Sequence, residues 1–285
     1  MTYGWAILII AIVLGALFAL GIFNSGSLAS KSPPGSCQVY RPNGPGTTSY
    51  INLEGTCNNG LPQYVAQFNG QSSYINVGQM QQESGTAPVS YSVWFMILSL
   101  SAPYPMAFGD TGASTRNGYD LFAGGPGSYG GDPNHIIIER LAGGTPAAMS
   151  AINTFTLNTW YYAVVTYNGI ALSLYLNGAP QGSTASAGSI TVDSSMSLGA
   201  DSGGGVGEFG NYQFADFQAY NTSLTANEIT ALYDEGIGGV PLNLNSLVGW
   251  WPLNGNANDY SGNLNNGVPT SVVYTSSWTS SYSAP

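Results

Sequence analysis

The stretch NTWYYAVVTYNGIALSLYLNGAPQGST, residues 158–184, decides the fold. It contains two runs rich in Tyr, Val, Ile and Leu, at 160–167 and 171–176. Aromatic and β-branched residues of this kind are enriched in strands. Asn168-Gly169 and Asn177-Gly178 flank the second run, and Asn-Gly pairs favour tight hairpin turns. The stretch therefore predicts a meander of antiparallel strands over 160–184.

Similar runs continue on both sides of this meander, separated by Gly, Asn, Pro or Asp. They lie at 50–53, 64–68, 73–77, 89–98, 135–141, 196–200 and 212–220. Short strands with regular punctuation predict a mainly β protein, an all-β sandwich. One helix is expected near the end, because Thr225 and Glu228 have the spacing of a capping box and Gly236 can end the helix.

These segments resemble the LamG-like family of the concanavalin A-like jelly-roll fold. The matching pieces are FNGQSSYINVG (68–78), YSVWF (91–95), 158–184 and FADFQAYNTSLTANEITALYDEG (214–236). The resemblance implies a two-sheet β-sandwich of the kind found in extracellular adhesion and sugar-binding modules, with a short helix packed against it.

The order of the pieces differs from the LamG-like pattern at the C-terminal end. LVGWWPLNGNANDYSGNLNNGV (247–268) is similar to the opening strand of such a domain, yet it follows the closing helix. We therefore expect a circularly permuted sandwich over 37–285, with 247–279 completing it. The rival hypothesis gives this strand to a neighbouring subunit by β-strand addition.

The N-terminal stretch MTYGWAILIIAIVLGALFALGIF, residues 1–23, has no charged side chain. As a helix rising about 1.5 Å per residue, it is long enough to cross a bilayer core of about 30 Å. Ala11, Gly15 and Ala19 stand four residues apart on one face, a spacing that lets helices pack closely in apolar surroundings. We expect a hydrophobic helix over 1–25 and a Ser-, Gly- and Pro-rich linker over 26–36.

Residues 1–14 resemble the N-terminal helix of archaeal type IV pilin-like proteins. In that family the helix first sits in the membrane and later packs with its copies as the core of a surface filament. The resemblance implies a structural subunit of an extracellular helical homopolymer, with the LamG-like domain on its outer surface. The basic leader, cleavage site and early glutamate of many pilins are not in this sequence. The alternative hypothesis is a single-pass, membrane-anchored adhesin that binds surface glycans without polymerising.

Charged residues make up only 6% of the chain, with 14 Asp and Glu against 4 Lys and Arg. Nucleic-acid binding requires Lys and Arg that neutralise phosphates, so the sequence argues against it. Glycosidases of this fold pair two carboxylates across a cleft, and their usual E-x-D-x-x-E strand is missing. We expect no enzymatic activity and no required cofactor. A surface with so few carboxylates changes little on protonation, which favours an acidic or otherwise harsh exterior habitat.

Two polar sites are suggested near the C-terminal half. Asp259, Ser261 and Asn263 place oxygen atoms at alternate positions of a turn, which suits Ca²⁺. Ca²⁺ takes about six to eight oxygens, however, and a turn in which the Asp caps its own backbone is the alternative. Asn221 begins the sequon Asn-Thr-Ser, so we expect it to be exposed and available for N-glycosylation.

A carbohydrate-binding face is suggested by tyrosines in the Gly-, Pro- and Asp-rich stretch 101–134. The candidates are Tyr104, Tyr119 and Tyr129. The alternative interpretation is that these tyrosines only fill the surface, since the chain has 19 of them.

Cys37 and Cys57 are the two cysteines of the chain, and outside the membrane such a pair predicts a disulfide. Closing a loop of this size stabilises the fold by about 3 kcal/mol in the chain-entropy model. Cleavage after Glu54 separates the two cysteines, so native protein digested without reductant should yield one linked peptide pair. Two unlinked peptides carrying alkylated thiols would contradict the prediction.

Overall fold

The computed structural model describes residues 61–100, 105–111, 116–124, 134–202 and 208–285, and the backbone of two strands at 36–40 and 50–54. The chain divides into two compact units, Met1–Leu53 and Glu54–Pro285. Strands β1 (Ser36–Tyr40) and β2 (Tyr50–Glu54) pair with each other in a two-stranded sheet. The sandwich itself is built from strands of the second unit. The expected domain boundary at residue 37 stays a prediction.

Several predicted features lie outside the described residues. They are the helix over 1–25 with Ala11, Gly15 and Ala19, the linker over 26–36, the side chain of Cys37, and Cys57, Tyr104 and Tyr129. Within the described part of the chain, no helix is long and apolar enough to cross a membrane.

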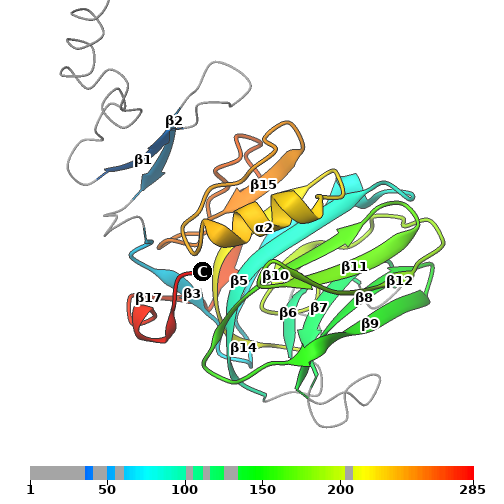
Figure 1. The fold of residues 1–285 in the computed structure, drawn as a ribbon, viewed down its shortest axis with the longest axis horizontal. Helices are drawn as coiled ribbons and strands as arrows, with labels where there is room; N and C mark the ends of the chain where they lie inside the picture. Colours follow the sequence, from blue (N-terminus) through cyan, green and yellow to red (C-terminus); the bar gives the residue numbers. More distant parts are fainter. Residues whose placement is uncertain are drawn as a thin grey trace, which may run out of the picture. The chain divides into compact units, whose positions relative to one another are not determined.

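The second unit is a sandwich of two antiparallel sheets (Figure 1). The eight-stranded sheet has the order β12-β11-β10-β5-β14-β3-β17, with β15 also paired to β14. Its strands are β3 (Val65–Gln67), β5 (Val89–Ser99), β10 (Trp160–Tyr167), β11 (Ala171–Leu176), β12 (Ala179–Ala185), β14 (Asn211–Tyr220), β15 (Leu247–Trp251) and β17 (Val273–Thr275).

The seven-stranded sheet has the order β16-β4-β13-β6-β7-β8-β9. Its strands are β4 (Tyr74–Gly78), β6 (Met106–Gly109), β7 (Gly118–Ala123), β8 (His135–Ala142), β9 (Thr145–Thr154), β13 (Met196–Leu198) and β16 (Val268–Thr270). Two short 3-10 turns, η1 (Gln81–Glu83) and η3 (Thr279–Ser281), lie outside the sheets.

The predicted meander is confirmed as β10, β11 and β12, which pair in chain order. An Asn-Gly pair lies in each of its two turns. Asn168 Oδ1 accepts hydrogen bonds from the backbone N of Ile170 at 3.0 Å and of Ala171 at 2.9 Å. In the second turn Asn177 and Gly178 have φ of 50° and 74°, the left-handed region that Asn and Gly tolerate best.

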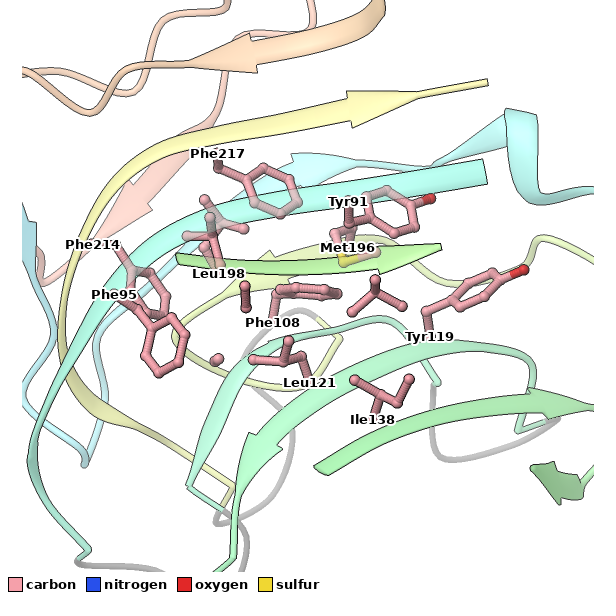
Figure 2. Packing of buried hydrophobic residues seen from close by; sticks show 14 of the residues in the cluster. Tyr91, Phe95, Phe108, Tyr119, Leu121, Ile138, Met196, Leu198, Phe214 and Phe217 are labelled. Atoms are coloured by element: carbon pink, nitrogen blue, oxygen red, sulfur yellow. The ribbon is translucent and has the colours of Figure 1, made fainter. Parts of the chain in front are cut away.

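The core lies between the two sheets and is rich in aromatic rings, as Figure 2 shows. Strand alternation directs one side of each strand inward. From β5 the inward side chains include Tyr91 and Phe95, and from β14 they include Phe217. The rings of Tyr91 and Phe217 lie parallel within 4° at 6.1 Å, and Phe108 of β6 meets Phe217 at 5.4 Å. The two sheets are therefore joined by direct ring contacts.

Helix α2 (Ala226–Asp234) covers the outer face of the eight-stranded sheet (Figure 1). The predicted capping box is present: the Thr225 side chain accepts from Glu228 N, and Glu228 accepts from Thr225 N. Tyr233 of the helix stacks on Trp94 of β5 at 5.7 Å. The helix is thus fixed by its cap and by an aromatic contact.

The C-terminal segment pairs with strands of its own chain in both sheets. In the eight-stranded sheet Trp251 of β15 lies opposite Phe217, and Tyr274 of β17 lies opposite Ala66. In the seven-stranded sheet β16 pairs with β4. Residues 247–279 therefore close the sandwich within one chain in this structure. That the order arose by circular permutation stays a prediction.

Candidate functional site

The sparse charges of the chain are concentrated where β6, β7 and β8 lie side by side. Six of the 14 acidic side chains influence one another's ionisation there: Glu83, Asp110, Asp120, Glu139, Asp201 and Glu208. Two of the four basic side chains, Arg116 and Arg140, also act on this group. In a chain with so few charged residues, this concentration in one region marks a candidate functional site.

Strand alternation divides these side chains between the two faces of the seven-stranded sheet. Asp120 of β7 lies opposite Glu139 of β8, and both point to the outer face. The neighbouring pair, Tyr119 and Arg140, points into the sandwich. Asp110 follows β6, and its Oδ1 accepts a hydrogen bond from Tyr119 N at 2.7 Å.

The outer face is traversed by one row of residues in register across all seven strands. The row is Ala148, Glu139, Asp120, Gly109, Ser197, Asn76 and Val268. At its centre, a Cβ added to Gly109 would lie 2.5 Å from Asp120 Oδ1 and 3.1 Å from Asp201 Oδ1. The absent side chain at Gly109 therefore leaves room for these two carboxyl groups.

We call Asp120, Glu139, Asp201 and Glu208 the acidic cluster. Asp120 and Glu139 are buried at its base, whereas Asp201 and Glu208 are half-buried. Asp201 Oδ1 accepts from Ser202 N at 2.6 Å, and a side-chain hydrogen bond joins Asp201 to Glu208. Asp120 Oδ1 is buried and has no hydrogen-bond partner. It is therefore an unsatisfied polar atom at the base of the cluster.

Burial raises the pKa of every carboxyl in the acidic cluster. Repulsion from Asp201 adds to this for the other three members, raising the pKa of Asp120, Glu139 and Glu208 further. The exposed guanidinium of Arg116 acts in the opposite direction on the pKa of Glu139 and Glu208. Burial therefore favours the protonated form of these carboxyls more than water does.

Carboxyl groups in this arrangement can accept hydrogen bonds from hydroxyl groups, and their oxygens are also the donors that hard cations prefer. Among the described residues, however, no group of three or more His, Cys, Asp or Glu side chains is placed to hold a metal ion. Hydroxyl groups of a ligand could donate hydrogen bonds to the carboxyl oxygens of this face.

A family model described as the concanavalin A-like lectin/glucanases superfamily matches residues 69–230, more than half of the chain. The chain belongs to this superfamily. All four members of the acidic cluster fall within the matched residues. No curated protein matches the chain.

Solved structures share the superfamily fold. One is a protein of Bacteroides ovatus ATCC 8483 provisionally assigned as carbohydrate-binding, with TM-score 0.57, 15% identity, and coverage of 80% of this chain and 62% of that one. Another is the native heptameric SAP-like pentraxin of Limulus polyphemus, with TM-score 0.53, 13% identity, and coverage of 75% and 94%. This chain thus spans less than two thirds of the Bacteroides protein. At these identities the likeness shows the fold alone.

Tyr119 is buried inside the sandwich, so the prediction that it contacts carbohydrate is wrong. It lies in β7 with no exposed surface, not in a loop. Its hydroxyl oxygen accepts a hydrogen bond from Arg140 Nε at 3.0 Å. Asn221, in contrast, is exposed after β14 as predicted, and its glycosylation stays a prediction.

The predicted calcium residues lie together in the loop after β15, where hydrogen bonds already engage them. Asp259 Oδ1 accepts from Trp250 N at 2.9 Å and from Ser261 N at 2.8 Å. Asp259 Oδ2 accepts from Ser261 Oγ and from Asn265 N, both at 2.9 Å. Asn263 Nδ2 donates to Val248 O at 2.9 Å. These contacts fit the alternative in which the Asp caps its own turn, and calcium binding there stays a prediction.

Sequence reasoning missed the acidic cluster as a site. Its members are far apart in the chain, and two of them stand in apolar strands, GYDLFA and HIIIERLA. The sequence did contain one signal. Charged residues are rare in this chain, so an acidic residue within an apolar strand is unusual and marks a candidate functional position. Pairing of β13 with β6, β6 with β7 and β7 with β8 brings these distant segments together.

Replacing Asp259 by Asn should lower the free energy of unfolding by about 1–3 kcal/mol, because an amide nitrogen would then face the N–H of Asn265 or of Ser261. Chemical denaturation followed by Trp fluorescence would measure this. Asn258→Ser, at an exposed position of the same loop, is the control and should change little. An Asp259→Asn loss that appears only with added calcium would instead assign the loop to the metal.

Proposed function

We propose that this protein displays a glycan-binding sandwich at the cell surface, and that the outer face of its seven-stranded sheet binds a neutral sugar through the acidic cluster. The observation that carries the proposal is the unpartnered, buried acceptor Asp120 Oδ1 beneath the half-buried Asp201 and Glu208. A buried acceptor without a donor costs about 1–3 kcal/mol, and a ligand hydroxyl would remove that cost.

The charge of the site selects the class of glycan. Four carboxyls face one exposed cation, Arg116, and the chain as a whole has a net charge of −10. Sialylated, sulfated or uronic-acid sugars would bring a further negative charge to this face and be repelled. Neutral hexoses present only hydroxyl groups, which donate to carboxylates.

The comparisons support this proposal at the level of fold. Membership of a superfamily that includes lectins makes sugar binding a natural use of the sandwich, and the Bacteroides structure carries a provisional carbohydrate-binding assignment. We further propose that the chain is not an enzyme, since the sequence pattern expected of a glycosidase of this fold is missing.

The test is binding of the full chain to an array of neutral and acidic oligosaccharides. Asp201→Asn combined with Glu208→Gln should weaken binding to neutral glycans by about tenfold or more, because a hydrogen bond to a charged group contributes about 1.5–3 kcal/mol. Asp234→Asn, an exposed position on α2, is the matched control and should leave binding unchanged. Failure to bind any neutral glycan, or equal binding by the double variant, would remove the proposal.

A second proposal concerns how the sandwich is displayed. We propose that the protein is a subunit of an extracellular type IV pilus-like filament, inserted in the cytoplasmic membrane before assembly. The uncharged N-terminal stretch with Ala11, Gly15 and Ala19 on one face favours this over a monomeric anchored adhesin, because small residues in register suit close packing between copies.

Gly15→Leu should abolish the filaments while leaving the sandwich folded and membrane-bound. A larger side chain would force neighbouring helices apart, at about 1–3 kcal/mol per site, repeated in every subunit. Val13→Leu adds bulk off the small-residue stripe and is the control. Electron microscopy of surface material would count filaments, and a normal number with Gly15→Leu would assign the chain to the monomeric adhesin.

A further inference from the structure

A pair of carboxyl groups lies inside the sandwich, on the face of the seven-stranded sheet opposite to the acidic cluster. Glu83 ends the turn η1 and Asp110 follows β6; their side chains are 1% and 2% exposed. Glu83 and Asp110 lie close enough to interact, and Glu83 Oε2 is buried with no hydrogen-bond partner among the described residues. The Tyr91 hydroxyl donates to Glu83 Oε1, and Tyr119 N donates to Asp110 Oδ1 at 2.7 Å. We call Glu83 and Asp110 the inner acid pair.

The ionisable groups around the inner acid pair come from every strand packed against it. They are Tyr91 of β5, Tyr119 and Asp120 of β7, Arg140 of β8 and Asp201 after β13. Tyr167 of β10 lies behind Arg140, with its ring centre 4.1 Å from the guanidinium carbon. Arg140 is the one basic residue among these groups, and its charge acts on Glu83.

Arg140 is fully buried, and its recorded hydrogen bonds within the described residues end on neutral oxygens. Its nitrogens donate to the Tyr119 hydroxyl at 3.0 Å, to Ser186 Oγ at 3.2 Å, and to the carbonyl oxygens of Gly85, Ala187 and Gly188 at 3.0–3.3 Å. It can balance one buried negative charge at a distance. A second buried carboxylate would have no counter-charge, and two adjacent carboxylates repel each other.

The unpartnered Glu83 Oε2 can hydrogen-bond to the neighbouring Asp110 carboxyl only if one of the two groups carries a proton, since an ionised carboxylate has no donor. We propose that Glu83 and Asp110 share one proton in the folded protein, and that loss of this proton to water sets the upper pH limit of the fold. Such coupled carboxyls titrate as a pair, so the proton belongs to both residues.

Burial is the largest cause that raises the pKa of both groups, to about 7 for Glu83 and well above the usual range for Asp110. Because the folded pKa is raised, the folded state holds protons that the unfolded state releases above about pH 4.3. The resulting stability is fully present below that pH. It is lost as the pH rises toward and through 7.

The first contacts to open would be those around η1. Gly85 and Ile190 exchange two backbone hydrogen bonds of 2.8 Å, and Arg140 donates to the same Gly85 carbonyl. A doubly ionised pair would pull water or the guanidinium toward itself and disturb this bridge. The inference is independent of the ligand proposed for the outer face.

The test is chemical denaturation of the full chain from pH 4 to pH 9, for the wild type and Glu83→Gln. A Gln at position 83 keeps the acceptor for Tyr91 and supplies a permanent donor to Asp110. The wild-type folding constant should fall about tenfold per pH unit for each proton that the folded state retains. In Glu83→Gln this slope should be smaller by one proton, and Asp234→Asn should follow the wild type.

Equal slopes in Glu83→Gln and the wild type, or wild-type stability that rises from pH 4 to pH 8, would overturn the proposal. If Glu83→Gln does not fold, wild-type protein with ¹³C-labelled glutamate carboxyls gives a second measurement. One glutamate should titrate near pH 7 and do so also in Glu139→Gln, which removes the buried glutamate of the acidic cluster. Glutamates that all titrate below pH 5 would contradict a shared proton.

Discussion

The pairing of β14 on both of its edges is the constraint on which the sandwich depends. One edge pairs with the long β5, and the other pairs with β3 and then with β15. A bulge between Ala215 and Gln218, with Asp216 at φ 55°, bends the strand between these two partners. Because Trp250 Nε1 donates to Asp216 Oδ1 at 2.6 Å, the C-terminal segment is attached at that bend. The central strand therefore joins distant parts of the chain into one sheet.

Successive side chains of β7 and β8 point to opposite faces of the sheet, so the two faces carry different polar groups. One residue of each adjacent pair points outward to the acidic cluster, and its neighbour points inward to Arg140 and the tyrosines. The same backbone therefore supports a polar outer face and a buried charged network. A change of register by one residue would exchange the two, so the hydrogen-bond ladder between β7 and β8 determines which side chains each face presents.

Much of the sandwich was predictable, because its strands are punctuated by Asn-Gly turns and its helix begins with a capping box. The strands β6, β7 and β9 were missed, since GYDLFA contains an acid and TPAAMSAINT has weak β-propensity; their strand state comes from pairing with β8. The acidic cluster was not predictable, because Asp120 and Asp201 meet only through the sheet. Tyr119 was predicted to lie in a loop because Gly and Pro residues, which are typical of loops, flank the short strand β7 on both sides.

The C-terminal closure of the sandwich has a consequence for how the chain reaches its native state. The backbone N of Tyr64 bonds to the side chain of Asn254 across 190 residues, and β3 and β4 each receive a partner strand from the last part of the chain. Contacts of such long range make folding slow, since the intervening loop must close first. During synthesis, the edges of β3 and β4 that pair with β17 and β16 stay open until residues 268–275 have emerged. For that interval another chain can take the place of the missing strands, so a chaperone that covers these edges would protect the nascent protein from misassembly.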